Sequence, residues 1–221
     1  MVIIRDLFLF DMRFRIGFII LICLFLLVGL SFCSPYEQTA RRVVPRNRTP
    51  SSKHWLGTNS LGQDIFWQLT FAVRNSLLIG LISTAVSRII AVMNGMVSGY
   101  LGGPVDRVLS TITDSFVVIP RLPLLILVSF VFRGGLNIIT TALLLGFLDW
   151  AWPSKRYRAQ ILSLREREVT NTAVYCGMNT LKVIGKQHFP FLISYLLADL
   201  ISGFLWALGM EITLSVLGLS N

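Results

Sequence analysis

Five apolar segments, each close in length to the thickness of a lipid bilayer, constrain this chain more than any other feature. They comprise residues 16–32, 76–100, 115–132, 136–152 and 191–219. A helix needs about 20 residues to cross the roughly 30 Å hydrocarbon layer, and within that layer every backbone polar group must be bonded inside the protein. These runs, with a hydrophobic content of 54%, therefore predict an all-α integral membrane protein with five transmembrane helices.

Arg88, Asp199 and Glu211 are ionisable residues inside these segments. At the bilayer centre such a side chain costs roughly 2.5–3.5 kcal/mol on insertion scales, so each is expected to face protein or water. They either line a polar translocation path or make buried contacts between helices, and for Arg88 we favour a buried pair. Asp149, near the end of the fourth segment, is expected at the membrane interface.

The basic residues predict the orientation of the chain and account for its formal charge of +9. With the N-terminus inside, eleven basic residues face the cytoplasm and seven face outward, which favours this orientation. Because they gather beside apolar segments, they indicate a membrane protein rather than a nucleic-acid-binding one. Five outer basic residues form a cluster that touches either anionic headgroups or a partner: Arg41, Arg42, Arg46, Arg48 and Lys53.

The chain divides into two predicted domains. Residues 1–53 hold the first transmembrane helix and a connector rich in proline and arginine, and residues 54–221 form the core. Within the core, a charged helical loop at about residues 153–190 separates the fourth and fifth apolar segments. Such a loop at a membrane surface either docks a soluble partner or is simply a solvated connection.

Three residues of this loop suggest its local structure. Ala173 and Gly177 lie four apart, so on a helix they share one face and permit the close approach of another helix. Alternatively, Gly177 ends a helix, as glycine often does. Pro190 is expected to mark the start of the last segment, since its fixed φ suits a first helical turn.

The sequence shows no pattern for bond-making chemistry. His54 and His188 fall on opposite sides of the membrane in this topology, and Cys23, Cys33 and Cys176 lack metal-ligand spacing. Residues 185–187 read Gly-Lys-Gln, without the upstream glycine and the Ser or Thr of a phosphate-binding loop. The chain is therefore expected to bind neither metal nor ATP and not to be an enzyme.

Five short motifs follow one another along the chain. They are residues 54–64, residues 99–103 with Asp106, Asp114 followed by Pro120, the loop pattern at 171–173 with Gly177 and Pro190, and Glu211 with residues 214–219. In this order they resemble the membrane subunits of binding-protein-dependent ABC importers, in the branch that handles oligopeptides, dipeptides and nickel. The resemblance implies an ATPase-coupling site within the loop, formed by Arg165, Glu168, Asn171, Thr172, Ala173, Gly177, Leu181 and Pro190.

The chain also departs from this family's pattern. Asn171 and Thr172 replace the usual glutamate and first alanine of the loop. In the outer motif, Asn59 and Gln63 replace an acidic and a basic residue, and both Arg88 and Arg121 introduce charges at ordinarily apolar or small positions. The family's sixth span is expected to be missing after residue 219.

The resemblance implies a cell-membrane permease that forms the translocation path of an ATP-driven importer. Its expected partners are a second, similar permease, two cytoplasmic ATPases that hold ATP and Mg²⁺, and an extracytoplasmic solute-binding protein. The expected solute is a peptide or a related small molecule delivered by that binding protein. Two alternatives remain, a truncated membrane scaffold that binds partners without transport, and an ion channel built on Arg88, Asp199 and Glu211.

Overall fold

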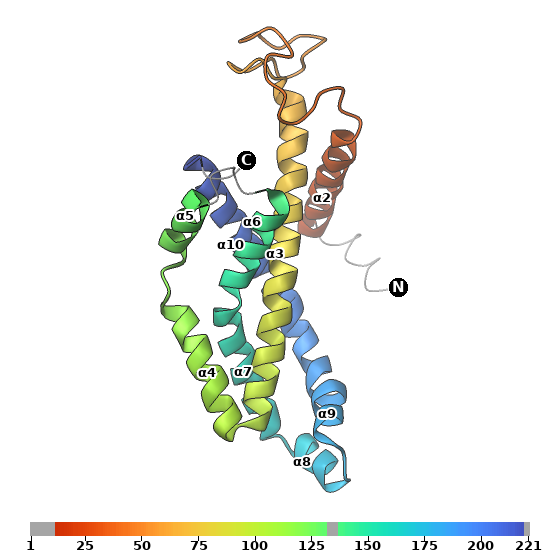
Figure 1. Cartoon of the computed structure of the whole chain (residues 1–221). Helices are drawn as coiled ribbons and strands as arrows, with labels where there is room; N and C mark the ends of the chain where they lie inside the picture. Colours follow the sequence, from red (N-terminus) through yellow and green to blue (C-terminus); the bar gives the residue numbers. More distant parts are fainter. Residues whose placement is uncertain (1–11, 132–136, 219–221) are drawn as a thin grey trace. The chain divides into compact units, whose positions relative to one another are not determined.

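Helices account for nearly all the regular structure in the computed structural model, which describes residues 12–131 and 137–218 (Figure 1). No strand occurs in these two ranges, where the only β pairing is an isolated bridge between Thr58 and Asp64. The all-α prediction is therefore confirmed. The helices are α2 (Met12–Ser31), α3 (Ile65–Leu101), α4 (Gly103–Val118), α5 (Arg121–Val131), α6 (Ile138–Asp149), α7 (Ala151–Arg165), α8 (Glu168–Tyr175), α9 (Thr180–Lys182), the π-helix η1 (Val183–His188) and α10 (Phe189–Val216).

The chain forms two compact units that divide at Leu77, inside α3. The predicted domain division after residue 53 stays a prediction. In the first unit the outer connector is held by specific hydrogen bonds: Thr58 Oγ1 donates to the Pro45 carbonyl over 2.6 Å, and Gln63 Nε2 donates to the Ala40 carbonyl over 3.0 Å. Asn59 donates to Gln63 over 3.0 Å, so the altered pair of the outer motif is still bonded. All five residues of the basic cluster are exposed.

Three helices are long and apolar enough to cross a membrane, namely α2, α3 and the run Val183–Val216 that joins η1 to α10. A fourth candidate is the pair α4 and α5, which together pass this test but are bent by 76°. The remaining apolar helix, α6, is only 12 residues long. The number of five spans therefore stays a prediction.

The third predicted segment, residues 115–132, is not one straight helix. Its helix α4 ends at Val118, and Ile119 adopts an extended conformation with ψ 123°. The cause is Pro120, whose ring disfavours the helical conformation in the residue before it. Phe132 lies outside the described residues, as does Leu136 at the start of the fourth segment.

The charged helical loop expected at about residues 153–190 begins within helix α7, which spans residues 151–165 inside the second unit. Tyr157 and Ile161 have no exposed surface, and Leu164 is 6% exposed. These three residues recur at spacings of four and three, so they line one helical face, while basic side chains occupy the other faces. Only residues 166–182 connect α7 to the last long helix.

Two glycines of α3 bring this helix against α7. A Cβ on Gly95 would lie 2.8 Å from the Ser154 carbonyl oxygen, and one on Gly99 would lie 2.9 Å from the Arg158 carbonyl oxygen. Glycines four residues apart present one bare strip, so two helix backbones can approach closely. This contact positions α7, and with it the residues described below.

Candidate coupling and intramembrane sites

Helix α8 carries the altered loop motif and turns it outward. Thr170 and Ala173 are buried at 5% and 6% exposure, whereas Asn171 and Thr172 are exposed. Tyr175, the last residue of α8, is 88% exposed. The helix therefore packs on the chain with one face and presents polar side chains and a tyrosine on the other.

Gly177 ends α8 and makes no close helix contact within the chain. Its φ is +79°, a left-handed conformation that glycine adopts without strain. The Met178 N–H donates to the Ala173 carbonyl over 3.0 Å, which is the bond of a Schellman C-terminal cap. A Cβ on Gly177 would meet no atom within 4 Å. Within this chain, the helix-end interpretation is therefore the one that the geometry supports.

The other predicted coupling residues flank α8. Arg165 ends α7, and a Cβ on Gly102 would lie 3.1 Å from its Nη1, so its guanidinium lies beside the turn between α3 and α4. Glu168 lies in the first turn of α8, where the helix dipole favours a negative charge. The side chain of Leu181 lies outside the described part of the structure.

Pro190 is the second residue of α10, so it lies in the first turn of the last long helix as predicted. This helix continues directly from η1. A proline inside a helix has no N–H to donate, and its ring displaces the carbonyl four residues earlier, here that of Lys186 in η1. The wider π-type turn, in which the Phe189 N–H donates to the Ile184 carbonyl, accommodates this displacement.

A buried hydrogen-bonded pair joins α8 to the beginning of α10. Thr170 Oγ1 donates to the Leu164 carbonyl over 2.8 Å and lies 3.0 Å from His188 Nε2. His188 is only 1% exposed, and its ring lies edge-on to that of Tyr100, with centroids 5.3 Å apart. Sequence reasoning missed this pair because 18 residues separate its members and neither belongs to the loop motif.

The second site is a buried charge network centred on Arg88, defined as Arg88, Arg121, Asp149, Arg156 and Asp199. The Arg88 side chain, 4% exposed, lies between two aspartates: Nη1 is 2.8 Å from Asp149 Oδ2, and Nε is 2.6 Å from Asp199 Oδ2. The buried pair expected for Arg88 is thus present, with two partners rather than one. Gly203 of α10 provides the space, since a Cβ there would lie 2.4 Å from Arg88 Nη2.

Further side chains hold the two aspartates. Arg121 Nη1 lies 2.9 Å from Asp149 Oδ1, and Arg156 pairs with Asp199. The Tyr157 hydroxyl donates to Asp199 Oδ2 over 3.1 Å. Burial, and then the Asp199 carboxylate, raise the pKa of Tyr157 above its usual range, so this hydroxyl stays protonated. The network joins α3, α5, α6, α7 and α10, and its three arginines exceed its two aspartates by one charge.

The location of Asp149 at the membrane interface stays a prediction, but its side chain is paired inside the protein. It is 6% exposed, at the end of α6, where Arg88 and Arg121 converge on its two oxygens. A carboxylate is stable in such a place because two guanidinium groups compensate for its lost hydration. Glu211, by contrast, is half-buried and lies twelve residues after Asp199, about 120° further round α10.

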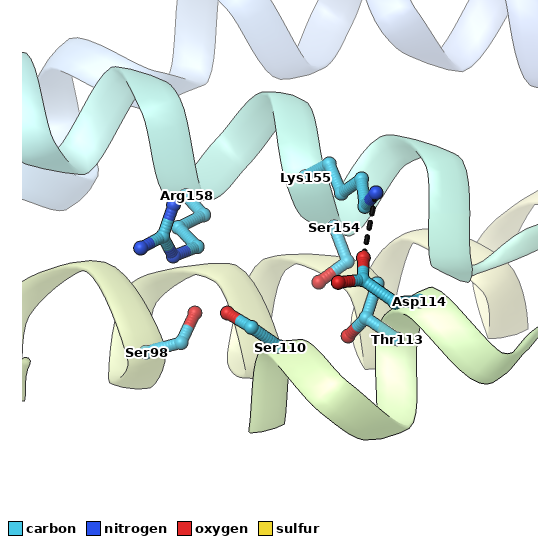
Figure 2. A pocket seen from close by; sticks show the side chains of 7 residues that line it. All are labelled: Ser98, Ser110, Thr113, Asp114, Ser154, Lys155 and Arg158. Atoms are coloured by element: carbon cyan, nitrogen blue, oxygen red, sulfur yellow. Dashed lines mark ion pairs between the residues drawn. The ribbon is translucent and has the colours of Figure 1, made fainter. Parts of the chain in front are cut away.

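A polar pocket of about 310 Å³ lies among α3, α4 and α7 (Figure 2). Lys155 of α7 reaches Asp114 of α4 over 2.6 Å, and both side chains are about half exposed. Deeper in, Arg158 donates two bonds of 2.6 Å to Asp106. These pairs connect α4 to α7, and sequence reasoning missed them because the members of each pair lie 41 and 52 residues apart.

A family model decides the chain's identity. Residues 91–221 match the model described as "Binding-protein-dependent transport system inner membrane component". The chain belongs to this family. The matched range begins in the second half of α3, so it includes α8 and every member of the charge network except Arg88.

Several curated relatives are permeases of the same family. The oligopeptide transport system permease protein OppC of Mycobacterium tuberculosis is 37% identical over 169 residues, which are 76% of this chain and 58% of the relative. The dipeptide transport system permease protein DppC of Bacillus subtilis is 29% identical, covering 92% of this chain and 63% of the relative. The nickel transport system permease protein NikC of Escherichia coli is 30% identical, covering 75% and 60%.

The family membership confirms the predicted resemblance and the predicted location in the cell membrane. It places the chain among transport components rather than enzymes. The chain spans about three fifths of the length of the curated relatives that it matches.

Proposed function

We propose that this chain is the transmembrane permease subunit of an ATP-driven importer, which passes a peptide or a related small solute delivered by an extracytoplasmic binding protein. The names of the relatives, which include oligopeptide, dipeptide and nickel permeases, support this solute class. ATP and Mg²⁺ would be held by two separate ATPase subunits, and a second permease would complete the path.

The observation that carries this proposal is the outward face of α8. A short helix with Asn171, Thr172 and Tyr175 exposed, capped by Gly177, is a compact surface that a soluble partner can bind. Tyrosine is enriched among the residues that dominate binding energy at protein interfaces. Because Asn171 is neutral where the family pattern has glutamate, the matching ATPase groove is expected to lack a strict requirement for a negative charge.

Purification of the tagged full chain from its native membranes tests the assignment. Two ATPases with a phosphate-binding loop, a second permease and a solute-binding protein are expected in the complex. Reconstituted in liposomes with ATP, this complex should accumulate solute from the binding-protein side. A complex that contains membrane partners but no ATPase would favour the scaffold alternative, and ATP-independent ion flux would favour the channel.

The docking surface gives a sharper prediction at Gly177. Gly177→Val places a β-branched residue at φ +79°, which such residues essentially never adopt, so the end of α8 must change conformation. Recovery of the ATPases with the tagged chain is expected to fall about tenfold, which corresponds to about 1.4 kcal/mol of binding energy. The amount of chain in the membrane should not change, because Gly177 lies outside every apolar segment.

Gly177→Asn is the matched control, since asparagine tolerates the left-handed conformation and often replaces glycine at this cap position. It should keep ATPase recovery within about twofold of the unchanged chain. Equal recovery in Gly177→Val and Gly177→Asn would show that the ATPases do not bind at α8.

A further inference from the structure

One buried hydroxyl group of α8 makes hydrogen bonds to two other elements of the chain. Thr170 Oγ1 contacts the Leu164 carbonyl oxygen at 2.8 Å and His188 Nε2 at 3.0 Å, and both Thr170 and His188 are almost fully buried. Leu164 belongs to the last turn of α7, and its carbonyl also accepts a hydrogen bond from the Arg167 N–H over 3.2 Å. His188 is the last residue of η1. One hydroxyl group therefore connects three helical elements.

The direction of these two hydrogen bonds is fixed by the available protons. A threonine hydroxyl has one proton, and a carbonyl oxygen can only accept, so Thr170 donates to Leu164. It must then accept from His188, whose Nε2 carries the proton. This places a proton on Nε2 of His188, whereas the buried Nδ1 has no hydrogen-bond partner among the described residues. We call this pair of hydrogen bonds, from Thr170 to Leu164 and from His188 to Thr170, the joint. It requires a hydrogen-bond donor at position 188 and a hydroxyl group at position 170.

The position of His188 makes this joint mechanically significant. It lies two residues before Pro190, in a π-helical turn that the proline imposes, and π turns often mark functional sites in helices. Its ring also contacts Tyr100 at the end of α3. Eleven residues further along, the same run of helix carries Asp199, which the charge network holds.

We propose that Thr170 and His188 are positioning residues that transmit a displacement of α8 to α10. This inference rests on the proposed function, because it assumes that an ATPase moves α8. When α8 shifts, the Thr170 hydroxyl moves with it and pulls the His188 ring. The pull acts on η1, whose wide turns yield more easily than α-helical turns, and so reaches the beginning of α10. Asn171 and Thr172 bind the partner, whereas Thr170, on the opposite face, conveys its movement.

Four variants of the full chain separate transmission from mere packing. Thr170→Val keeps the shape of the side chain but removes the hydroxyl, and Thr170→Ser keeps the hydroxyl. His188→Phe keeps the ring contact with Tyr100 but removes the donor, and His188→Gln restores an N–H donor on a side chain of similar reach. The assembled complex in liposomes gives ATPase recovery, solute uptake and ATP hydrolysis for each variant.

Thr170→Val and His188→Phe are expected to keep ATPase recovery within about twofold while lowering solute uptake per ATP hydrolysed about fivefold, since one hydrogen bond is worth about 1 kcal/mol. Thr170→Ser should restore most of the uptake, and His188→Gln part of it. The proposal is overturned if uptake per ATP is unchanged in both Thr170→Val and His188→Phe. It is also overturned if Thr170→Ser loses as much uptake as Thr170→Val.

Backbone hydrogen exchange on the purified chain tests the joint without its partners. In Thr170→Val, exchange should rise both in α8 and in residues 183–188, because the two segments are expected to open together. A rise confined to α8 would show that the helices are not connected through Thr170. If the unchanged chain recovers no ATPase at all, the proposed function fails, whereas an unresponsive η1 in a chain that does recover ATPases overturns the joint alone.

Discussion

Asp149→Asn is expected to lower the free energy of unfolding of the second unit by about 3–5 kcal/mol, the usual effect of removing one member of a buried ion pair. The substitution keeps the size of the side chain but removes the charge that Arg88 and Arg121 share. Arg88, Arg121 and the more exposed Arg156 would then have only Asp199 as a carboxylate partner in the network. Thermal unfolding in detergent, followed by size-exclusion chromatography of the soluble fraction, measures this loss.

Asp114→Asn is the matched control because it makes the same chemical change at an exposed pair. Asp114 and Lys155 are 57% and 44% exposed, and such pairs contribute about 0–1 kcal/mol. Adding Arg121→Gln to Asp149→Asn should recover part of the stability, since the double variant no longer buries the unpaired arginine. Similar unfolding temperatures for Asp149→Asn and Asp114→Asn would mean that Asp149 is hydrated.

Gly95→Ala is expected to destabilise the chain by about 1–3 kcal/mol, the usual effect of an overpacked site, although alanine is the better helix former. The added Cβ would lie 2.6 Å from Tyr157 Cβ and within 3 Å of two backbone atoms of α7. Backbone atoms of a packed helix cannot rotate away, so α3 and α7 must separate. The separation would also shift Tyr157, whose hydroxyl bonds Asp199.

Gly209→Ala in α10 provides the opposite expectation, because a Cβ there would meet no atom within 4 Å. The gain in helix propensity should stabilise this variant by up to about 1 kcal/mol. Both variants are compared by thermal unfolding under the same conditions. A Gly95→Ala variant as stable as Gly209→Ala would contradict the close contact between α3 and α7.

The sequence was sufficient to predict the helical class and the existence of a buried pair at Arg88. Both follow from local properties, the length of apolar runs and the high energy of an unpaired charge in hydrocarbon. The identity of the partners did not follow, since Asp149 and Asp199 lie 61 and 111 residues from Arg88. Only the packing of five helices determines which carboxylates reach it.

Two features of the structure were not predicted, for specific reasons. The charges between residues 154 and 168 obscured the apolar spacing of Tyr157, Ile161 and Leu164, so the buried face of α7 was not predicted. Pro120 was interpreted as part of a family motif rather than as a helix break. The candidate coupling residues were also predicted only in part. Gly177 was predicted as a possible helix end, but the sequence gave no signal for the contact between Thr170 and His188.

The π-helix η1 has a consequence for register along the polypeptide. A π turn contains more residues than an α turn. The number of residues in η1 therefore sets the rotation of α10 about its own axis. Each α-helical residue rotates the chain by 100°. Deleting one residue from 183–188 would therefore turn α10 by about a quarter of a revolution, moving Asp199 and Gly203 away from Arg88 together. The number of residues in η1 therefore determines whether Asp199, eleven residues after His188, faces Arg88.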